Sequence, residues 1–521
     1  MTIKKITLGF IIAATLTGTG CSKKFEDLQV DPNRATTVPA SLVLSGVLWD
    51  YYQSPWGSTQ RWNQFSCCNY NYYGTQEYGW TGVSFGPYNT LKNIGKMEEE
   101  AKKGGAADVN PYSALAKFFK AHFFYELSMR VGDIPLKEAL AGLKDLTPAY
   151  DTQKDVMIQV LKWLEDANTE LASLIKEGNT LLTGDFYHNN NLSKWQKSVN
   201  AMRLRVLIQL SKKEADTDLN IKAKFAAIIN NLTANPLPAG MGDNLSFAYN
   251  NAFNKYPINP DNYGFDATRY NMSETYLNRL AETKDPRVFV TAEPTPKALL
   301  AGKLPSDFTA YNGASSGEDL AIMSTKANNG DYSWFNRKRY YTTYQAENCI
   351  LLGYPEMCFN IAEGINRGWA TGTAEDWYKK GIQASQGSYG IVTGDNTFYY
   401  QRPGGNNFDN LTYTYNFNWT NYYAQPEVSY AGNNAAGLTQ ILKQKYFAFY
   451  QNSGWEAYFN WRRTGVPTFL VGPGTANSTR IPKRFLYPSS ENATNADNVK
   501  AAIQRQFGGL DEINAEMWII K

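Results

Sequence analysis

Apolar residues recur every three or four positions in several stretches of the chain, which is the spacing that places them on one face of an α-helix. Asn110 and Pro111 supply a cap and a first-turn residue for a helix over about 113–130. After Thr152, apolar side chains at positions 157, 160, 164, 167, 171 and 174 continue the pattern. This regularity predicts a second helix that packs along its whole length against another helix.

More helices follow in the same way. Ser193 and Gln196 form a capping-box pattern ahead of a third helix. The remaining predicted helices cover residues 354–368, 374–385 and 438–451. Helix pairs joined by short turns are typical of tetratricopeptide-like stacking, although no 34-residue repeat is visible. The pattern therefore predicts a mainly α fold, with a helical scaffold mainly in 90–235 and 350–465.

Polar, aromatic, Asn- and Gly-rich stretches separate these helices. They cover residues 49–88, 244–270, 310–344 and 399–430. Their Tyr and Trp content argues against disorder, so we expect ordered loops with short strands. We expect the loop-rich insertions at about 49–88 and 244–344 to form the ligand side of the molecule.

Aromatic residues exceed what helix cores require, with 35 Tyr, 13 Trp and 26 Phe against two His. A flat ring packs on the C–H face of a sugar or on a peptide side chain, and neighbouring amides satisfy the polar groups of the ligand. For any single ring, core packing is the alternative. The candidate ligand-binding residues are Trp56, Trp62, Tyr70, Tyr72, Tyr73 and Trp80, with Asn69, Asn71 and Gln76 interleaved, and then Tyr263, Tyr270, Trp334, Tyr340 and Tyr341.

The N-terminus has the pattern of a secretion signal. Lys4 and Lys5 precede an apolar run over 6–16, and small residues then lead to Cys21. Eleven helical residues span about 16 Å against a hydrocarbon core of roughly 30 Å, so the run is too short to cross a membrane. Residues 1–20 are therefore predicted to be a lipoprotein signal peptide, and Cys21 the acylated, membrane-anchored N-terminus. A soluble periplasmic protein is the alternative.

Charge, cysteines and motifs argue against several functions. A formal charge of +3 indicates no nucleic-acid partner. Cys67, Cys68, Cys349 and Cys358 show no CxxC spacing, and both disulfides and free thiols stay open. No metal cluster or cofactor motif occurs, so we expect no metal and no cofactor. Residues 313–317 match G-x-S-x-G, but both histidines precede them, contrary to the hydrolase order.

The most specific segment is WEAYFNWRRTGVP at 455–467, followed by PKRFLYPSSENATNADN from Pro482. By itself it predicts a packed helix end with a turn at 464–465, where paired arginines form a structural clamp. Together with YELSMRVGDIPLKEAL from Tyr125, AYDTQKDV from Ala149 and AEGINRGW from Ala362, it resembles the SusD/RagB family, in particular its SusD-like branch. The chain departs from the commonest family residues at Val131 and Gly364.

This resemblance implies a SusD-like nutrient-binding domain over 21–521 that is not an enzyme. It implies a lipid-anchored outer-membrane protein facing the cell exterior, which binds oligosaccharides and delivers them to a SusC-like TonB-dependent transporter. The family site lies in the loop after the first helix together with the middle insertion. Binding of oligopeptides, a surface glycoside hydrolase and an adhesive lipoprotein are the alternatives, the hydrolase because 48 carboxylates always contain some close pair.

Overall fold

The structure is a computed structural model that describes residues 37–405 and 407–521. The predicted signal peptide and Cys21 lie outside the described residues. The predicted mainly α fold is confirmed, because long helices alternate with loop-rich segments that contain short strands. In the described part of the chain, no helix is both long and apolar enough to cross a membrane.

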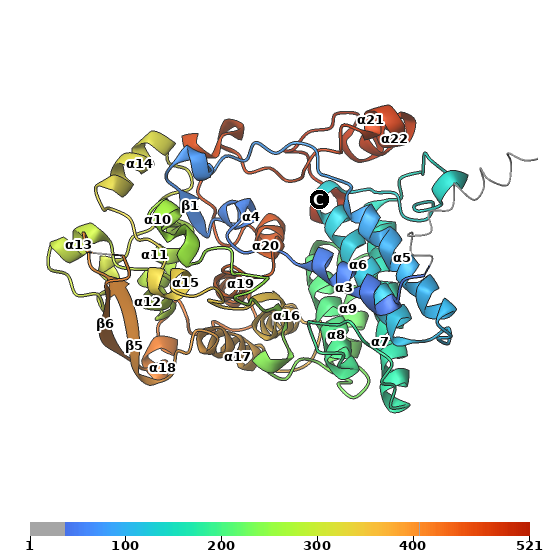
Figure 1. Cartoon of the computed structure of the whole chain (residues 1–521), viewed down its shortest axis with the longest axis horizontal. Helices are drawn as coiled ribbons and strands as arrows, with labels where there is room; N and C mark the ends of the chain where they lie inside the picture. Colours follow the sequence, from blue (N-terminus) through green and yellow to red (C-terminus); the bar gives the residue numbers. More distant parts are fainter. Residues whose placement is uncertain (1–36, 406) are drawn as a thin grey trace, which may run out of the picture.

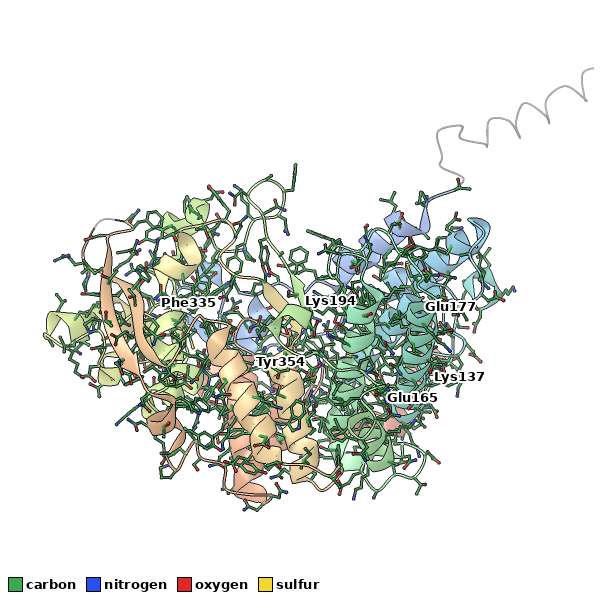
Figure 2. All side chains as sticks on the ribbon, turned by 90° about the horizontal axis from the view of Figure 1, so that it is seen from below. Lys137, Glu165, Glu177, Lys194, Phe335 and Tyr354 are labelled. Carbon is green, nitrogen blue, oxygen red and sulfur yellow. The ribbon has the colours of Figure 1, made fainter. Side chains whose placement is uncertain are left out.

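One group of long helices forms a scaffold on the blue-to-green side of Figure 1. Its helices are α3 (Ala40–Tyr51), α5 (Pro87–Lys103), α6 (Pro111–Val131), α7 (Gln153–Lys176), α8 (Leu192–Gln209) and α9 (Ile221–Ile229). Helix α7 packs on both α6 and α8. Figure 2 places Lys137, Glu165 and Glu177 on this side of the molecule. The predicted helices after Asn110 and Thr152 are confirmed, and both residues cap their helices.

The predicted capping box at Ser193 is wrong. Helix α8 begins at Leu192, and its cap is Asn191, whose side-chain oxygen accepts from the backbone N–H of Lys194 at 3.0 Å. The amide of Gln196 instead donates to the side-chain oxygen of Asn168 on α7 at 3.0 Å. Gln196 therefore makes a tertiary contact with α7 instead of the capping contact that the local pattern predicted.

A second group of helices lies between the scaffold and the loop-rich side in Figure 1. It consists of α16 (Tyr354–Asn366), α17 (Ala374–Gly387), α19 (Ala435–Ala448) and α20 (Glu456–Thr464). Helices α16 and α17 pack as the predicted pair. Helix α20 ends at Thr464, and the next residue, Gly465, has a left-handed backbone (φ 75°) that makes the predicted turn.

The arginines of α20 form a structural clamp, as expected. The Arg463 guanidinium lies 2.5 Å from the carboxylate of Glu363 on α16 and donates to the Ser211 hydroxyl at 2.8 Å. Arg462 donates to the backbone carbonyl of Lys483 at 2.9 Å. The clamp thus joins α20 to α16, to the chain just after α8 and to the segment that follows α20.

The loop-rich side contains short helices and paired strands. Its short helices are α4 (Ser58–Trp62), α10 (Tyr263–Asp266), α11 (Glu274–Glu282), α12 (Arg287–Thr291), α13 (Pro296–Leu300), α14 (Leu320–Asn328), α15 (Arg337–Tyr341) and α18 (Trp419–Tyr423). The strands are β1 (Ser66–Cys68), β2 (Leu245–Phe247), β3 (Tyr270–Met272), β4 (Cys349–Leu352), β5 (Gly394–Gln401) and β6 (Asn410–Phe417). They pair antiparallel as β1–β3, β2–β4 and β5–β6. The C-terminal part adds α21 (Glu491–Thr494) and α22 (Ala496–Phe507).

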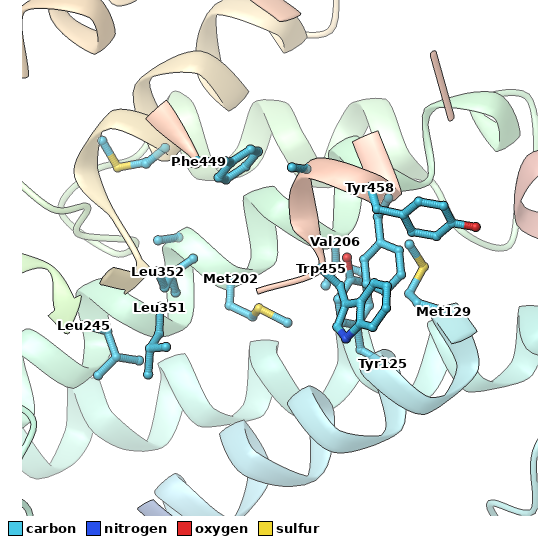
Figure 3. Packing of buried hydrophobic residues seen from close by; sticks show 14 of the residues in the cluster. Tyr125, Met129, Met202, Val206, Leu245, Leu351, Leu352, Phe449, Trp455 and Tyr458 are labelled. Carbon is cyan, nitrogen blue, oxygen red and sulfur yellow. The ribbon is translucent and has the colours of Figure 1, made fainter. Parts of the chain in front are cut away.

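One core connects the two helix groups. Figure 3 shows Tyr125 and Met129 of α6 and Val206 of α8 near Trp455 and Tyr458. These side chains are buried. The four described cysteines are also buried and are free thiols, which answers the question that their spacing left open.

Candidate functional site

The pairing of β1 with β3 brings the two predicted ligand-side insertions together. Cys68 lies opposite Tyr270, and the next residue, Asn69, donates its backbone N–H to the carbonyl of Arg269 at 2.9 Å. The Asn69 side chain also donates to the carbonyl of Thr268 at 3.1 Å. Beyond this junction lies a surface that we call the tyrosine platform, composed of Arg61, Tyr70, Tyr72, Tyr73, Phe265, Arg269 and Tyr270.

Three rings of the platform are exposed, and the half-buried rings of Tyr73 and Tyr270 support them. Tyr72 is 81% exposed, Phe265 71% and Tyr70 48%. The Tyr73 ring centre lies 5.1 Å from that of Tyr72 and 6.0 Å from that of Tyr270. The Tyr73 hydroxyl donates to the backbone carbonyl of Phe265 at 2.7 Å, which ties the first insertion to the middle one. The protein therefore holds the platform together through its own contacts.

The interleaved amides of the first insertion differ in position. Asn71 is exposed between Tyr70 and Tyr72. Gln76 is buried, and its side-chain oxygen accepts from the backbone N–H of Cys68 at 2.6 Å. Of these two candidates, only Asn71 is placed to reach a ligand beside the rings.

Two guanidinium groups flank these rings. The Arg269 guanidinium lies 5.3 Å from the ring centre of Tyr70. Arg61 donates to the carbonyl of Thr75 at 3.3 Å and lies across Gly74, where a Cβ atom would approach its Nη2 to 2.5 Å. Gly74 also has a φ of 134°, a backbone conformation that favours glycine. Gly74 thus gives the turn its shape and leaves room for the guanidinium.

A buried carboxyl group lies next to the platform. Asp266 accepts a hydrogen bond from the Tyr341 hydroxyl at 2.8 Å, and burial raises the pKa of Asp266. Burial, with the nearby charges of Cys68 and Asp266, raises the pKa of Tyr270 to about 12. The Tyr270 hydroxyl is protonated at neutral pH, as it is in an ordinary tyrosine, and can donate a hydrogen bond.

The predicted tryptophans of the first insertion pack against the body of the protein. Trp80 is 5% exposed and stacks on Phe485 with ring centres 4.1 Å apart. Trp62 is half-buried and donates its indole N–H to a backbone carbonyl at 2.9 Å. The indole N–H of Trp56 donates to the Tyr256 hydroxyl at 2.7 Å. We therefore leave these three tryptophans out of the platform.

Three aromatic residues, Phe335, Trp56 and Tyr340, support the platform from within. Tyr270 stacks with Phe335, and the ring of Phe335 lies 4.4 Å from that of Trp56. Tyr340 is fully buried, with its ring 4.8 Å from Trp56. These rings form a layer that fixes the position of Tyr270.

The last two candidates of the middle insertion, Tyr263 and Trp334, are engaged in contacts within the protein. Tyr263 is buried and its hydroxyl donates to the side chain of Gln401. Trp334 is half-buried, with the Arg337 guanidinium 4.5 Å from its ring centre. Both contact the protein itself, so we leave them out of the platform as well.

Two adjoining clefts form a second surface feature. A cleft of about 540 Å³ lies between α15 and β5, and one of about 410 Å³ lies beside it near β4. Both are lined by Arg339 and Tyr389. The Arg339 guanidinium lies 4.9 Å from the Tyr389 ring centre and pairs with Glu347 at 2.6 Å. The charge of Arg339 is thus already balanced within the protein.

Phe265, Arg61, Arg269 and the clefts were not predicted from the sequence. Phe265 lies within the aromatic stretch 244–270, so that stretch contained the signal, but nothing local distinguishes an exposed ring there from a buried one. The two arginines are isolated in the sequence, and only the β1–β3 pairing brings them to the same surface. The clefts likewise combine residues near 340, 390 and 450 that no local pattern connects.

The serine of the G-x-S-x-G match is Ser315, which is half-buried. Neither histidine is its partner, because His188 lies 2.8 Å from the Ser198 hydroxyl and the ring of His122 packs against Tyr51 and Phe123. The match therefore lacks the histidine that activates a hydrolase nucleophile. Among residues 37–405 and 407–521, no three His, Cys, Asp or Glu side chains are grouped to hold a metal ion.

The structure thus combines a helix-pair scaffold with a loop-built aromatic surface. A family model described as "Starch-binding associating with outer membrane" matches residues 45–488. The chain therefore belongs to the SusD-like family, and the predicted resemblance is confirmed. The family is described as associated with the outer membrane.

Solved structures agree with this assignment. A SusD homologue from Bacteroides fragilis is 30% identical, with 93% of this chain and 100% of that chain covered and a TM-score of 0.81. A second Bacteroides fragilis homologue is 31% identical, with the same coverage and a TM-score of 0.76. A chitin-binding SusD homologue from Flavobacterium johnsoniae shares the fold at 20% identity, covering 92% of this chain and 98% of that one, with a TM-score of 0.66. A comparison with the curated proteins found no match.

Proposed function

We propose that this protein binds oligosaccharides at the tyrosine platform and delivers them to a SusC-like TonB-dependent transporter. The observation that carries the proposal is the convergence of exposed rings from two insertions about two hundred residues apart. The family description as starch-binding and the chitin-binding relative support a glycan as ligand. Oligopeptides are the second ligand class, because exposed tyrosines also pack on peptide side chains.

The platform suits binding better than catalysis. Tyrosine presents a rigid contact surface with few rotatable bonds, and the hydrogen bond from Tyr73 to Phe265 fixes the rings before the ligand arrives. Glycoside hydrolysis needs two carboxyl groups on either side of the scissile bond. The platform residues contribute none, and the neighbouring Asp266 is buried. We therefore propose a binder that leaves its ligand intact; shortened oligosaccharides after incubation with the protein would contradict this.

The anchor and the partner are further parts of the proposal. Cys21 would carry the acyl groups that hold the protein at the outer membrane, facing the cell exterior. Replacing Cys21 by Ala should abolish labelling with a palmitate analogue and release the protein from membranes. Mild detergent extraction should recover the wild-type protein together with a large β-barrel protein. Recovery of the protein always alone would contradict the transporter partnership.

The platform is tested by removing its two tyrosines with the most exposed rings. Tyr70→Ala and Tyr72→Ala should each weaken ligand binding about tenfold, because each ring supplies contact worth about 1.4 kcal/mol. Binding is measured by affinity electrophoresis over a panel of polysaccharides and a peptide mixture, followed by calorimetry. The thermal unfolding temperature should stay unchanged, since both side chains are exposed.

The matched control is Phe186→Ala. Phe186 is 44% exposed and lies in the connection between α7 and α8, on the scaffold rather than the platform. Its removal should leave affinity unchanged. If both tyrosine variants keep wild-type affinity for the best ligand of the panel, the platform is not the binding site.

A further inference from the structure

The two guanidinium groups of the tyrosine platform have no balancing charge among the described residues. Several buried arginines elsewhere in the chain pair with carboxylates, as do Arg205, Arg337 and Arg463. Within 37–405 and 407–521, neither Arg61 nor Arg269 has a carboxylate within salt-bridge distance. Arg61 makes one side-chain hydrogen bond there, through Nε, and the Arg269 side chain makes none. Both guanidiniums therefore keep free donors beside the exposed rings.

The acidic residues nearby do not compensate these charges. Asp266 is buried, and its carboxylate accepts from the Tyr341 hydroxyl rather than from either guanidinium. Asp261 is paired with Lys255 at 2.6 Å. Glu77, two residues after the Thr75 carbonyl that Arg61 contacts, is exposed and makes no salt bridge with either arginine. The platform therefore combines aromatic rings with two guanidiniums that have no carboxylate within salt-bridge distance among the described residues.

We propose that the ligand of this platform is an acidic glycan, whose carboxylates or sulfates pair with Arg61 and Arg269. A planar guanidinium matches the two oxygens of a carboxylate or sulfate, and such charge-assisted hydrogen bonds are about twice as strong as neutral ones. The tyrosine rings then contact the sugar faces between the acidic groups. This inference rests on the proposed function, since it names the ligand class of the same site.

The neighbouring clefts provide a contrast within the same molecule. There the Arg339 guanidinium is already paired with Glu347. The Lys338 ammonium has no salt bridge among the described residues, but it shares the larger cleft with the carboxylate of Asp395. The platform instead offers two guanidiniums, Arg61 and Arg269, and none of the residues that compose it is acidic, which favours it over the clefts as the anion site.

The experiment compares polysaccharides that differ only in charge. The pairs are polygalacturonate with its carboxyl-reduced polymer, and chondroitin sulfate with its desulfated, carboxyl-reduced form. Binding is measured by affinity electrophoresis and calorimetry on the full chain. In at least one pair, the acidic member should bind at least about tenfold tighter, and its affinity should fall when NaCl rises from about 50 to about 500 mM because salt screens exposed charges.

Variants then identify the residues responsible. Arg269→Gln should weaken binding of the acidic polymer about tenfold without changing the unfolding temperature, because its side chain makes no hydrogen bond with the described residues. Arg269→Lys should retain part of the affinity, since it keeps the charge but loses the planar pair of donors. Arg61→Gln combined with Arg269→Gln should remove the preference for the acidic member. Lys500→Gln on α22, an exposed residue that loses the same charge, should have no effect.

Four outcomes would overturn the inference. The inference is wrong if the neutral polysaccharides bind as tightly as the acidic ones, or if the double variant still prefers the acidic members. Either result would leave the proposed glycan binding in place. If the protein binds acidic peptides and none of the polysaccharides, its ligand is a peptide and not a glycan. Retention of no polysaccharide and no peptide would overturn the proposed function as well.

Discussion

At the scale of single residues, the aromatic side chains of the first insertion divide between core and surface irrespective of residue type. Trp80 and Tyr78 are buried, whereas Trp49, Tyr70 and Tyr72 are exposed. The environment that the fold gives each position, rather than the kind of ring, therefore decides which rings are packed. The sequence predicts the surplus of rings, but these residues share one polar stretch, so it does not separate packed rings from exposed ones.

The ion pair between Arg463 and Glu363 should be among the most sensitive single contacts. Both side chains are buried, and Arg367 also donates to Glu363 at 2.8 Å. Burial by itself would raise the pKa of Glu363, but the charges of Arg463 and Arg367 prevail and lower it to about 2. Glu363→Gln leaves two guanidiniums without their carboxylate and should cost about 3–5 kcal/mol of unfolding free energy, measured with urea near neutral pH.

The same variant has a distinct pH dependence. Since the folded pKa of Glu363 lies below its value in the unfolded chain, the stabilisation is present above about pH 4.5 and is lost as the pH falls toward 2. The stability gap between wild type and Glu363→Gln should therefore narrow below about pH 4.5. Asp166→Asn, which removes an exposed pair with Lys162, should cost less than about 1 kcal/mol. A gap that stays constant down to about pH 3 would contradict the assignment.

At the scale of elements, helices were predictable because their signals are local. Periodic apolar residues and caps place α6 and α7 to within a few residues. The start of α8 was misplaced because Asn191 and Ser193 are both good caps, and packing of Gln196 on Asn168 decided between them. The pairing of β1 with β3 leaves no local trace, since residues about two hundred positions apart must meet. The platform built on that pairing was therefore predictable only in part.

Gly364, where the chain departs from the commonest family residue, lies at a contact between two helices. A Cβ atom on Gly364 of α16 would approach the Phe225 ring of α9 to 2.2 Å. Gly364→Ala should therefore destabilise the protein by about 1–3 kcal/mol through overpacking, measured by chemical denaturation. Adding Phe225→Leu should recover part of the loss, because the smaller side chain vacates the position. Strictly additive effects of the two substitutions would show that the helices do not compete for this space.

At the scale of the whole molecule, a buried polar network joins the scaffold to the second helix group. Arg205 on α8 lies 2.5 Å from Glu356 on α16 and donates to the Leu351 carbonyl at 2.8 Å. Glu456 on α20 lies 4.0 Å from Arg205 and accepts from the Tyr125 hydroxyl on α6 at 2.9 Å. One guanidinium thus balances two carboxylates at the point where four helices meet.

Arg205→Gln should lower the stability of the whole protein but leave the tyrosine platform intact. The substitution leaves Glu356 and Glu456 buried without this cation, so we expect the free energy of unfolding to fall by about 3–5 kcal/mol near neutral pH. The control is Arg402→Gln, which removes an exposed pair with Asp409 and should lower the free energy of unfolding by less than about 1 kcal/mol. Burial, with the charge of Glu356, already raises the pKa of Glu456, and loss of Arg205 raises it further. A carboxyl whose folded pKa is raised takes up a proton as the pH falls, so the deficit of the variant should shrink toward about pH 5.

Ligand binding by the Arg205→Gln variant distinguishes the two roles of the fold. The platform stands on β1, β3 and α10, which do not contain any member of this network. Below its unfolding temperature the variant should bind the ligand of the wild type with unchanged affinity, and ligand should raise its unfolding temperature by mass action. A variant that is folded by circular dichroism but has lost affinity would mean that the helix groups, and not only the local β1–β3 pairing, hold the rings in place.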